Sequence, residues 1–324
     1  MRRLVSITTL LLLAAVAAQA SVDDVIRKGF NVNAGGRLTL DASFGDVKVV
    51  TGGNGVAIEI VRRARTADKS EAAEIFKDHE ITFDQNGNDV FIKSRYDHPN
   101  RWFHWNDSLS VQWNIRVPKN YSVDLRTSGG DVHLTDVSGE VEVRTSGGDI
   151  DAGRITGPAD LRTSGGDIDV MSASGNVNAH TSGGDIKVGD TTGSVEVKTS
   201  GGSIELARVS GDVNARTSGG GIRIEEARGR VDASTSGGSI TARFAQQPAG
   251  DSRLSTSGGS VTVFLAANVG ADLDAHSSGG GVRSDLPITI VGSQERDSLE
   301  GKINGGGPRL VLRTSGGGIS VQRM

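Results

Sequence analysis

The tetrapeptide Thr-Ser-Gly-Gly recurs at a fixed interval along this chain and constrains its fold more than any other feature. Seven copies follow one another 18 residues apart, beginning at Thr127, Thr145, Thr163, Thr181, Thr199, Thr217 and Thr235. Later copies begin at Thr256 and Thr314, and Ser277 begins a Ser-Ser-Gly-Gly variant. A fixed period of this length is typical of repeat architectures, in which each unit buries its apolar face only against its neighbours.

Each repeat contains two short segments in which apolar and polar residues alternate. In the first repeat, Val132 and Leu134 flank His133, and Val141 and Val143 flank Glu142. A period of two predicts β-strands with one buried face, and we expect the paired glycines to supply positive φ angles at the corners. Stacking the repeats in register predicts an all-β fold, a parallel β-solenoid (β-helix) with two strands in each 18-residue coil.

Two other solenoids fit the spacing less well. A hexapeptide helix needs an aliphatic residue at every sixth position, but Ser138 and Arg144 occupy these positions when counted from Val132. Calcium-binding arrays need a GGxGxD nonapeptide, whereas the motif here is SGGD.

Composition excludes several classes of protein. The 324 residues contain 46 glycines and no cysteine, and only 4% are aromatic. The absence of cysteine rules out a disulfide scaffold, a cysteine-based zinc site and a cysteine nucleophile. A formal net charge of −4 gives no reason to expect a nucleic-acid partner.

The first 20 residues have the features of a secretory signal peptide. Arg2 and Arg3 precede an apolar stretch over 4–18, and Ala18-Gln19-Ala20 forms an A-x-A cleavage site. The alternative is an uncleaved anchor, which the short apolar run disfavours because a spanning helix needs about 20 residues. No later segment is apolar enough to span a membrane. We therefore expect an exported protein, either periplasmic or at the cell surface.

Between the signal peptide and the repeats, residues 21–121 predict a β-rich region that starts and caps the solenoid. The sequence predicts a short helix over 68–78 with Asp68 or Ser70 as N-cap, a hairpin over 80–94 with an Asn-Gly turn, and an aromatic loop over 96–107. The solenoid repeats occupy 122–324, with an insertion at about 287–304.

Residues 114–134 (NIRVPKNYSVDLRTSGGDVHL), followed by serial TSGGDI units, resemble the DUF4097 family of adhesin-like β-strand repeat proteins. The segments 37–95 and 301–321 (GKINGGGPRLVLRTSGGGISV) are also similar to that family. The resemblance implies an exported or envelope β-solenoid, right-handed by analogy, and it supplies no catalytic residue.

Stacking the repeats would place like charges in columns. A basic column precedes the TSGG motif and contains Arg126, Arg144, Arg162, Lys198 and Arg216. An acidic column follows the motif and contains Asp131, Asp149, Asp167 and Asp185. We expect both columns to be structural, with the basic one offsetting repulsion in the acidic one if they face each other across a corner. The alternative is a site for cations or for an anionic polymer.

One segment departs from the aromatic-poor composition. Arg101, Trp102, Phe103 and Trp105 lie together and form a candidate binding loop for glycans, peptides or a lipid interface. The alternative is a plug in which Trp102 and Trp105 close the end of the solenoid. We expect Trp113 to lie in the core or on a strand face.

No catalytic grouping stands out in the sequence. The six histidines are scattered and form no HExxH motif, and we expect neither a metal site nor a cofactor. The sequence thus predicts a non-enzymatic, adhesin-like binding or scaffold module at the cell envelope, whose partner is an envelope component, a glycan, a lipid or a protein surface. A self-assembling envelope scaffold and a polysaccharide-active β-helix enzyme are the alternatives.

Overall fold

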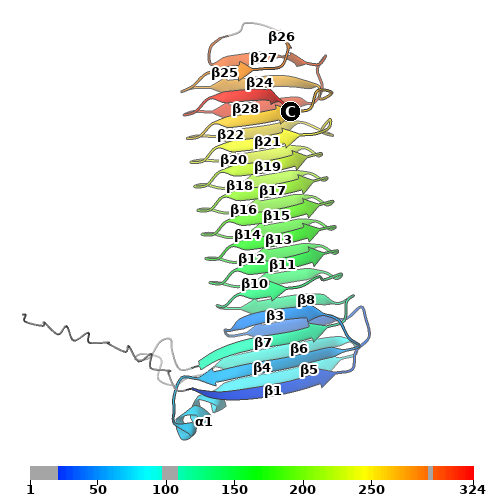
Figure 1. The fold of residues 1–324 in the computed structure, drawn as a ribbon, viewed down its shortest axis with the longest axis vertical. Helices are drawn as coiled ribbons and strands as arrows, with labels where there is room; N and C mark the ends of the chain where they lie inside the picture. Colours follow the sequence, from blue (N-terminus) through cyan, green and yellow to red (C-terminus); the bar gives the residue numbers. More distant parts are fainter. Residues whose placement is uncertain (1–20, 97–108, 291–294) are drawn as a thin grey trace, which may run out of the picture.

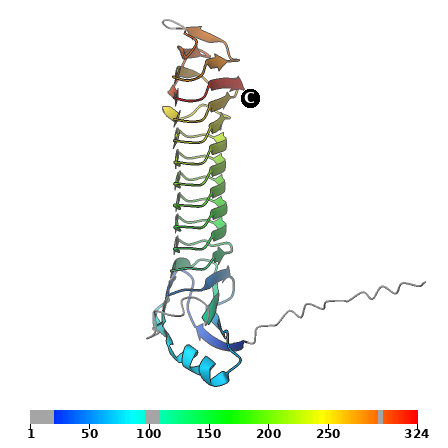
Figure 2. The ribbon, with the colours of Figure 1, turned by 90° about the vertical axis from the view of Figure 1, so that its left-hand side faces the viewer.

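A computed structural model describes residues 21–96, 109–290 and 295–324, and in these residues the chain winds into two long sheets that run the length of the molecule (Figure 1). Turned by 90°, the molecule is two thin layers of stacked strands with a short helix at one end (Figure 2). The expected all-β solenoid is confirmed. The expected signal peptide, residues 1–20, lies outside the described residues.

We call the two sheets A and B and give their strands in spatial order. Sheet A contains β1 (Val22–Phe30), β4 (Val56–Ala64), β7 (Leu109–Val117), β3 (Asp46–Thr51), β9 (Val132–Leu134), β11 (Ile150–Ile155), β13 (Ile168–Ala173), β15 (Ile186–Thr191), β17 (Ile204–Val209), β19 (Ile222–Ala227), β21 (Ile240–Phe244), β23 (Val261–Leu265), β29 (Ile319–Arg323) and β25 (Val282–Ser284). Sheet B contains β26 (Ile288–Ile290), β27 (Ser298–Ile303), β24 (Ala271–Ser277), β28 (Arg309–Thr314), β22 (Ser252–Thr256), β20 (Val231–Thr235), β18 (Val213–Arg216), β16 (Val195–Lys198), β14 (Val177–His180), β12 (Ala159–Arg162), β10 (Val141–Arg144), β8 (Ser122–Thr127), β2 (Arg37–Ala42), β6 (Asp89–Tyr96) and β5 (His79–Asn86).

In the regular part of the stack, equivalent residues of successive coils pair directly. Val177 of β14 pairs with Val195 of β16, which pairs with Val213 of β18, and these valines are buried. On sheet A, Ile186 pairs with Ile204 in the same parallel manner. Alternate residues point inward, so the aliphatic side chains of both sheets form one continuous core.

The threonine of each TSGG motif is buried and bonds to the preceding coil. The Thr181 hydroxyl donates to the carbonyl oxygen of Gly166 at 2.8 Å, and the Thr199 hydroxyl donates to that of Gly184 at 2.8 Å. The same bond recurs at most repeats, so the threonines fix the corners through hydroxyl-to-backbone hydrogen bonds.

The corner glycines have a different role from the one we expected. Among the paired glycines of the repeats, all of which are described, only Gly130 has a positive φ, so the expectation of positive φ is wrong for the others. A Cβ at Gly184 would instead lie 2.2 Å from the carbonyl oxygen of Gly166. Glycine is therefore required there because one coil passes directly over the backbone of the coil before it.

The N-terminal end is built from the region that precedes the repeats. Helix α1 (Lys69–Lys77) has Asp68 as its N-cap, which accepts from the Ser70 N–H at 2.8 Å. Strands β5 and β6 form the expected hairpin, with Asn86 paired to Asp89 across the turn. The first coil of the chain, β2 and β3, lies between β6–β7 and the first repeat coil, β8–β9.

At the C-terminal end the order of coils in space differs from their order in the sequence. The last coil, β28–β29, lies between β22–β23 and β24–β25 rather than at the end of the stack. Beyond it, β27 pairs antiparallel with β24, and β26 pairs with β27. The last strands of the chain are thus held between two neighbours.

Candidate binding groove along the solenoid

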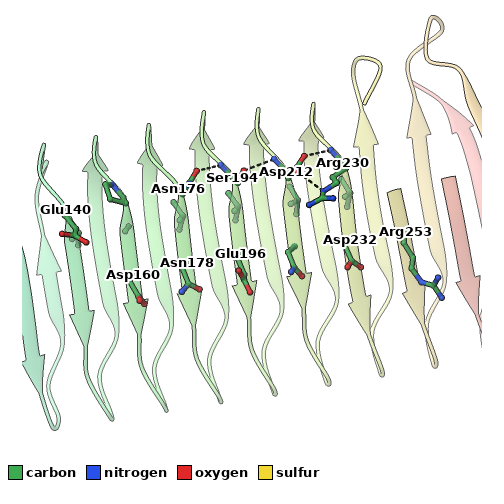
Figure 3. Close-up of a pocket in the computed structure, with 18 of the residues that line it drawn as sticks. Glu140, Asp160, Asn176, Asn178, Ser194, Glu196, Asp212, Arg230, Asp232 and Arg253 are labelled. Carbon is green, nitrogen blue, oxygen red and sulfur yellow. Dashed lines mark hydrogen bonds and ion pairs between the residues drawn. The ribbon is translucent and has the colours of Figure 1, made fainter. Parts of the chain in front are cut away.

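A long groove runs along the outer face of sheet B, across the coils from β10 to β22 (Figure 3). Its volume is about 650 Å³. With a spacing of about 4.8 Å between strands, these seven coils give a length of roughly 30 Å. A surface of this shape offers contacts at every coil to a partner that is itself long.

Two columns of outward side chains form the groove, and the strand pattern explains both. We call the first the mid-strand column, since its members lie between the two buried residues of each strand: Asp160, Asn178, Glu196, Asn214, Asp232 and Arg253. The second, the entry column, precedes each strand: Glu140, Asn176, Ser194, Asp212 and Arg230.

Hydrogen bonds between coils hold the entry column. Asn176 Oδ1 accepts the Ser194 N–H at 2.9 Å, and Ser194 Oγ accepts the Asp212 N–H at 3.3 Å. Asp212 Oδ1 accepts the Arg230 N–H at 3.1 Å, while its Oδ2 lies 2.9 Å from the Arg230 guanidinium. This side of the groove is therefore fixed by the stacking of the coils.

The mid-strand column is only partly neutralised. Arg162 binds Asp160 at 2.8 Å and Arg216 binds Asp232 at 3.1 Å. In the described part of the chain, the side chains of Asn178, Glu196 and Asn214 make no hydrogen bond or ion pair with protein. These three neighbours place one carboxylate between two amides. The Asn214 Oδ1 is buried without a partner, so toward a hydroxyl group Asn214 can only donate, whereas Glu196 accepts and Asn178 can do both.

The arginines of the basic column pair with carboxylates of their own sheet. Arg126 lies 3.1 Å from Asp124, Arg144 pairs with Glu142, and Arg162 pairs with Asp160. Burial raises the pKa of the Asp124 carboxyl, although Arg126 beside it acts in the opposite direction. Lys198, between Arg162 and Arg216 in sequence, belongs to the same column on β16.

The acidic column is held by backbone groups rather than by the basic column. Asp131 Oδ1 accepts the Asp149 N–H at 3.0 Å, and Asp149 Oδ1 accepts the Asp167 N–H at 2.8 Å. Asp167 repeats the contact with the Asp185 N–H at 2.7 Å. Each carboxylate thus bonds to the coil above it, which explains how aspartates can stand in adjacent coils.

An aromatic cluster lies at the N-terminal end of the core. Trp113 is fully buried, and its Nε1 donates to the carbonyl oxygen of Phe44 at 3.3 Å. The rings of His79 and Tyr96 pack against this pair. Burial, aided by the charge of Arg62, lowers the pKa of His79 to about 4, and its Nε2 lies 2.7 Å from Ser94 Oγ. Trp113 is therefore a core residue.

The candidate binding loop, Arg101, Trp102, Phe103 and Trp105, lies outside the described residues, so its role stays a prediction. Over residues 21–96, 109–290 and 295–324, no group of three or more histidine, aspartate or glutamate side chains could hold a metal ion. No helix in the same part of the chain is long and apolar enough to cross a membrane.

The groove itself was not predicted from the sequence. Its signal is the alternation of carboxylate and amide at the mid-strand position over the coils from Asp160 to Asp232. We noted only the columns beside the TSGG motif, whose side chains make the ion pairs and backbone bonds described above.

A model of the Toastrack DUF4097 family matches residues 114–214 and 159–322. No curated protein matches the chain. Among solved structures, a candidate adhesin from Parabacteroides merdae is 9% identical, with 93% of this chain and 96% of that chain covered and a TM-score of 0.39. A candidate lipid-binding protein from Parabacteroides distasonis is 12% identical (93% and 97% covered, TM-score 0.38). A candidate adhesin from Bacteroides fragilis is 13% identical (93% and 97% covered, TM-score 0.31).

Proposed function

The chain belongs to the Toastrack DUF4097 family, and from this premise we propose that it is an exported, non-enzymatic binding module that acts at the cell envelope in an adhesin-like manner. Its ligand is an extended, hydroxyl-rich polymer, a glycan, that lies along the sheet B groove. The basic start and the A-x-A site of residues 1–20 support export.

The observation that carries the proposal is the continuity of the groove over seven successive coils. One sugar residue of an extended polysaccharide is about as long as the spacing between coils. Successive sugars can therefore meet successive side chains of the mid-strand column. Each contact is weak, but contacts on one chain add through their high effective concentration.

The same repetition favours binding over catalysis. A hydrolase needs one acid and one base that differ from the groups around them. In the groove, equivalent carboxylates and amides recur from coil to coil, and most of the carboxylates are tied by a neighbouring arginine. Such a surface holds a polymer at many places and acts on it at none in particular.

The test compares two glutamates of one coil that lie on opposite sheets. Glu196 stands in the groove on β16, and Glu205 stands on the outer face of β17. We expect Glu196→Arg to reduce co-sedimentation with insoluble polysaccharides (peptidoglycan, cellulose or chitin) several-fold. We expect Glu205→Arg to leave it unchanged, because both residues are exposed and only the first faces the groove.

Three outcomes would contradict the proposal. Equal loss in both variants would show that binding depends on overall charge. Release of reducing ends by the unaltered protein would show an enzyme instead. Concentration-dependent filaments in the electron microscope, without binding to any of these polymers, would favour the self-assembling scaffold.

A further inference from the structure

A second hollow lies on the opposite sheet, at the N-terminal end of the molecule. It covers the outer faces of β1, β4, β7 and β3, the strands below the first repeat coil in Figure 1, and has a volume of about 620 Å³. A volume of this size is within the range of small-ligand sites. The hollow is separate from the sheet B groove and shares no lining residue with it.

Strand register places its polar side chains in one row across the sheet. Lys48 of β3 pairs with Asn114 of β7, which pairs with Glu59 of β4, which pairs with Arg27 of β1. These residues come from four separate segments of the chain, so no stretch of sequence shows the cluster. They lie on one face because β4 pairs antiparallel with β7 and β1 pairs antiparallel with β4.

The next row of residues across these strands contains small or apolar residues, which form the bottom of the hollow, and a further cation. Val50, Arg116, Ala57 and Gly29 follow one another across the same strands. A Cβ built at Gly29 would meet nothing within 4 Å, and Ala57 has only a methyl side chain. The Arg116 guanidinium therefore stands beside open space rather than against a neighbouring large side chain.

The charge of the hollow is opposite to that of the whole chain. Its lining contains Arg27, Lys28, Lys48 and Arg116, and its one carboxylate, Glu59, is paired with Arg27 at 2.7 Å. Across the residues that the structure describes, Lys48 and Arg116 make no ion pair. Lys28 pairs with the buried Ile58, so its side chain lies on the opposite face of β1 and does not add to this charge. Two unneutralised cations beside one ion pair give this small surface a positive charge in a protein of net charge −4, which favours an anion with several oxygens.

We propose that this basic hollow binds a phosphate group, carried either by a phospholipid headgroup or by a soluble phosphorylated molecule. A phosphate presents several acceptor oxygens to the Arg116 guanidinium and the Lys48 ammonium, and the Asn114 amide adds a neutral donor. The apolar floor formed by Val50 and Ala57 keeps part of the water away, which strengthens these charge-assisted bonds.

The chain contains a closely matched control for the test. Lys187 occupies the same position as Lys48 on the outer face of sheet A, four strands further along one column through His133, Asp151 and Asp169. Both lysines are exposed, and neither makes an ion pair in the described residues. Lys48→Glu and Lys187→Glu therefore make the same change of charge on the same kind of surface.

The probes are inorganic phosphate and glucose 6-phosphate, measured by calorimetry, and phosphatidylglycerol vesicles, measured by co-sedimentation against phosphatidylcholine vesicles. Because a charge-assisted bond is lost, we expect Lys48→Glu and Arg116→Glu to weaken binding at least about tenfold. We expect Lys187→Glu to change it less than about twofold, since it lies outside the hollow. Gly29→Phe fills the hollow without altering charge and is expected to weaken binding as well.

Binding of vesicles alone identifies the phospholipid headgroup as the source, and binding of the soluble phosphates identifies a free phosphorylated ligand. The proposal is overturned if the unaltered protein binds none of the probes, or if Lys187→Glu weakens binding as much as Lys48→Glu. It is also overturned if Gly29→Phe binds normally. An unchanged thermal midpoint in each variant shows that the coils remain folded.

Discussion

The corner glycines provide the sharpest test of how the coils stack. Gly147 and Gly148 are adjacent in one TSGG corner, and neither has a positive φ. A Cβ on Gly147 would meet its nearest atom, Cα of Gly129, at 4.0 Å, whereas a Cβ on Gly148 would lie 2.1 Å from the carbonyl oxygen of Gly130. We therefore expect Gly148→Ala to destabilise the protein strongly and Gly147→Ala to be nearly neutral.

The magnitude follows from the contacts that must open. A carbon normally approaches a carbonyl oxygen to about 3.3 Å, so the two coils must separate by roughly 1 Å at this corner. That shift stretches three hydrogen bonds beyond useful length: Thr145 Oγ1 to Gly130 O (3.2 Å), the Asp149 N–H to Asp131 Oδ1 (3.0 Å) and the Val132 N–H to Asp149 O (2.8 Å). At about 1 kcal/mol each, their loss lowers the free energy of unfolding by about 3 kcal/mol, at the upper end of what overpacking costs.

Urea unfolding followed by far-ultraviolet circular dichroism measures the difference between the two variants. Gly147→Ala is the control because it makes the same chemical change one residue away and reduces the entropy of the unfolded chain equally. Variants that unfold within about 0.5 kcal/mol of each other would refute the reasoning, because the close approach of the coils would then be no reason for glycine.

Three further predictions follow from the core and the two ends. Thr181→Val keeps the shape of the side chain but removes the bond to Gly166 O, and calorimetry should show a loss of about 1–3 kcal/mol, larger than for Thr181→Ser. Because burial holds the pKa of His79 near 4, the unfolded state binds a proton between pH 6.5 and 4 that the native state does not. The free energy of unfolding therefore decreases as the pH is lowered from 6.5 to 4, by at most about 1.4 kcal/mol per pH unit, and His79→Gln should flatten this slope in pH-dependent urea melts. Removal of 309–324 takes away β29, the partner of β25, and one of the two partners of β24, which keeps β27, so hydrogen exchange should become fast in β25 and faster in β24 in the truncated protein.

The coils could be predicted from the sequence because the repeat determines how each strand pairs with the equivalent strand of the next coil. Alternation of residues such as Val141 and Val143 with Glu142 fixes which side chains point inward, and the 18-residue period fixes the register. Trp113 was expected in the core or on a strand face for the same reason: it alternates with polar neighbours within β7.

The order of coils at the C-terminal end could not be predicted in the same way. Strands β22, β24 and β28 bury alternate side chains in the same pattern, so each can pair with either of the other two. Their order depends on the connection through 287–304, which forms β26 and β27 at the end of sheet B. Local sequence patterns carry no information about such a choice between equivalent neighbours.

The two candidate binding surfaces escaped prediction for different reasons. The basic hollow combines Arg27, Lys48 and Arg116, which are separated along the chain and meet only through the order of strands in sheet A. The groove is periodic and visible in the sequence. However, an outward column alone does not show that the surface between the columns is concave.

Electrostatics explains which part of the groove is available to a ligand. Like charges one coil apart repel by about 0.9 kcal/mol in a water-like dielectric, and an uncharged coil between them halves this. Consecutive carboxylates occur at Asp124, Glu142 and Asp160, where an arginine follows two residues later on the same strand and pairs with each.

Beyond Asp160 the stack changes to the alternation of amide and carboxylate, and the arrangement of partners changes with it. Asp232 is still bound, by Arg216 of the neighbouring coil. Glu196 stands between Asn178 and Asn214, whose amides keep it apart from the next carboxylates in both directions. Since an amide carries no charge, this spacing removes the need for an arginine at Glu196. Apart from the buried Asn214 Oδ1, the hydrogen-bonding groups of these three side chains therefore remain available, and the middle of the groove is where a polymer would find them.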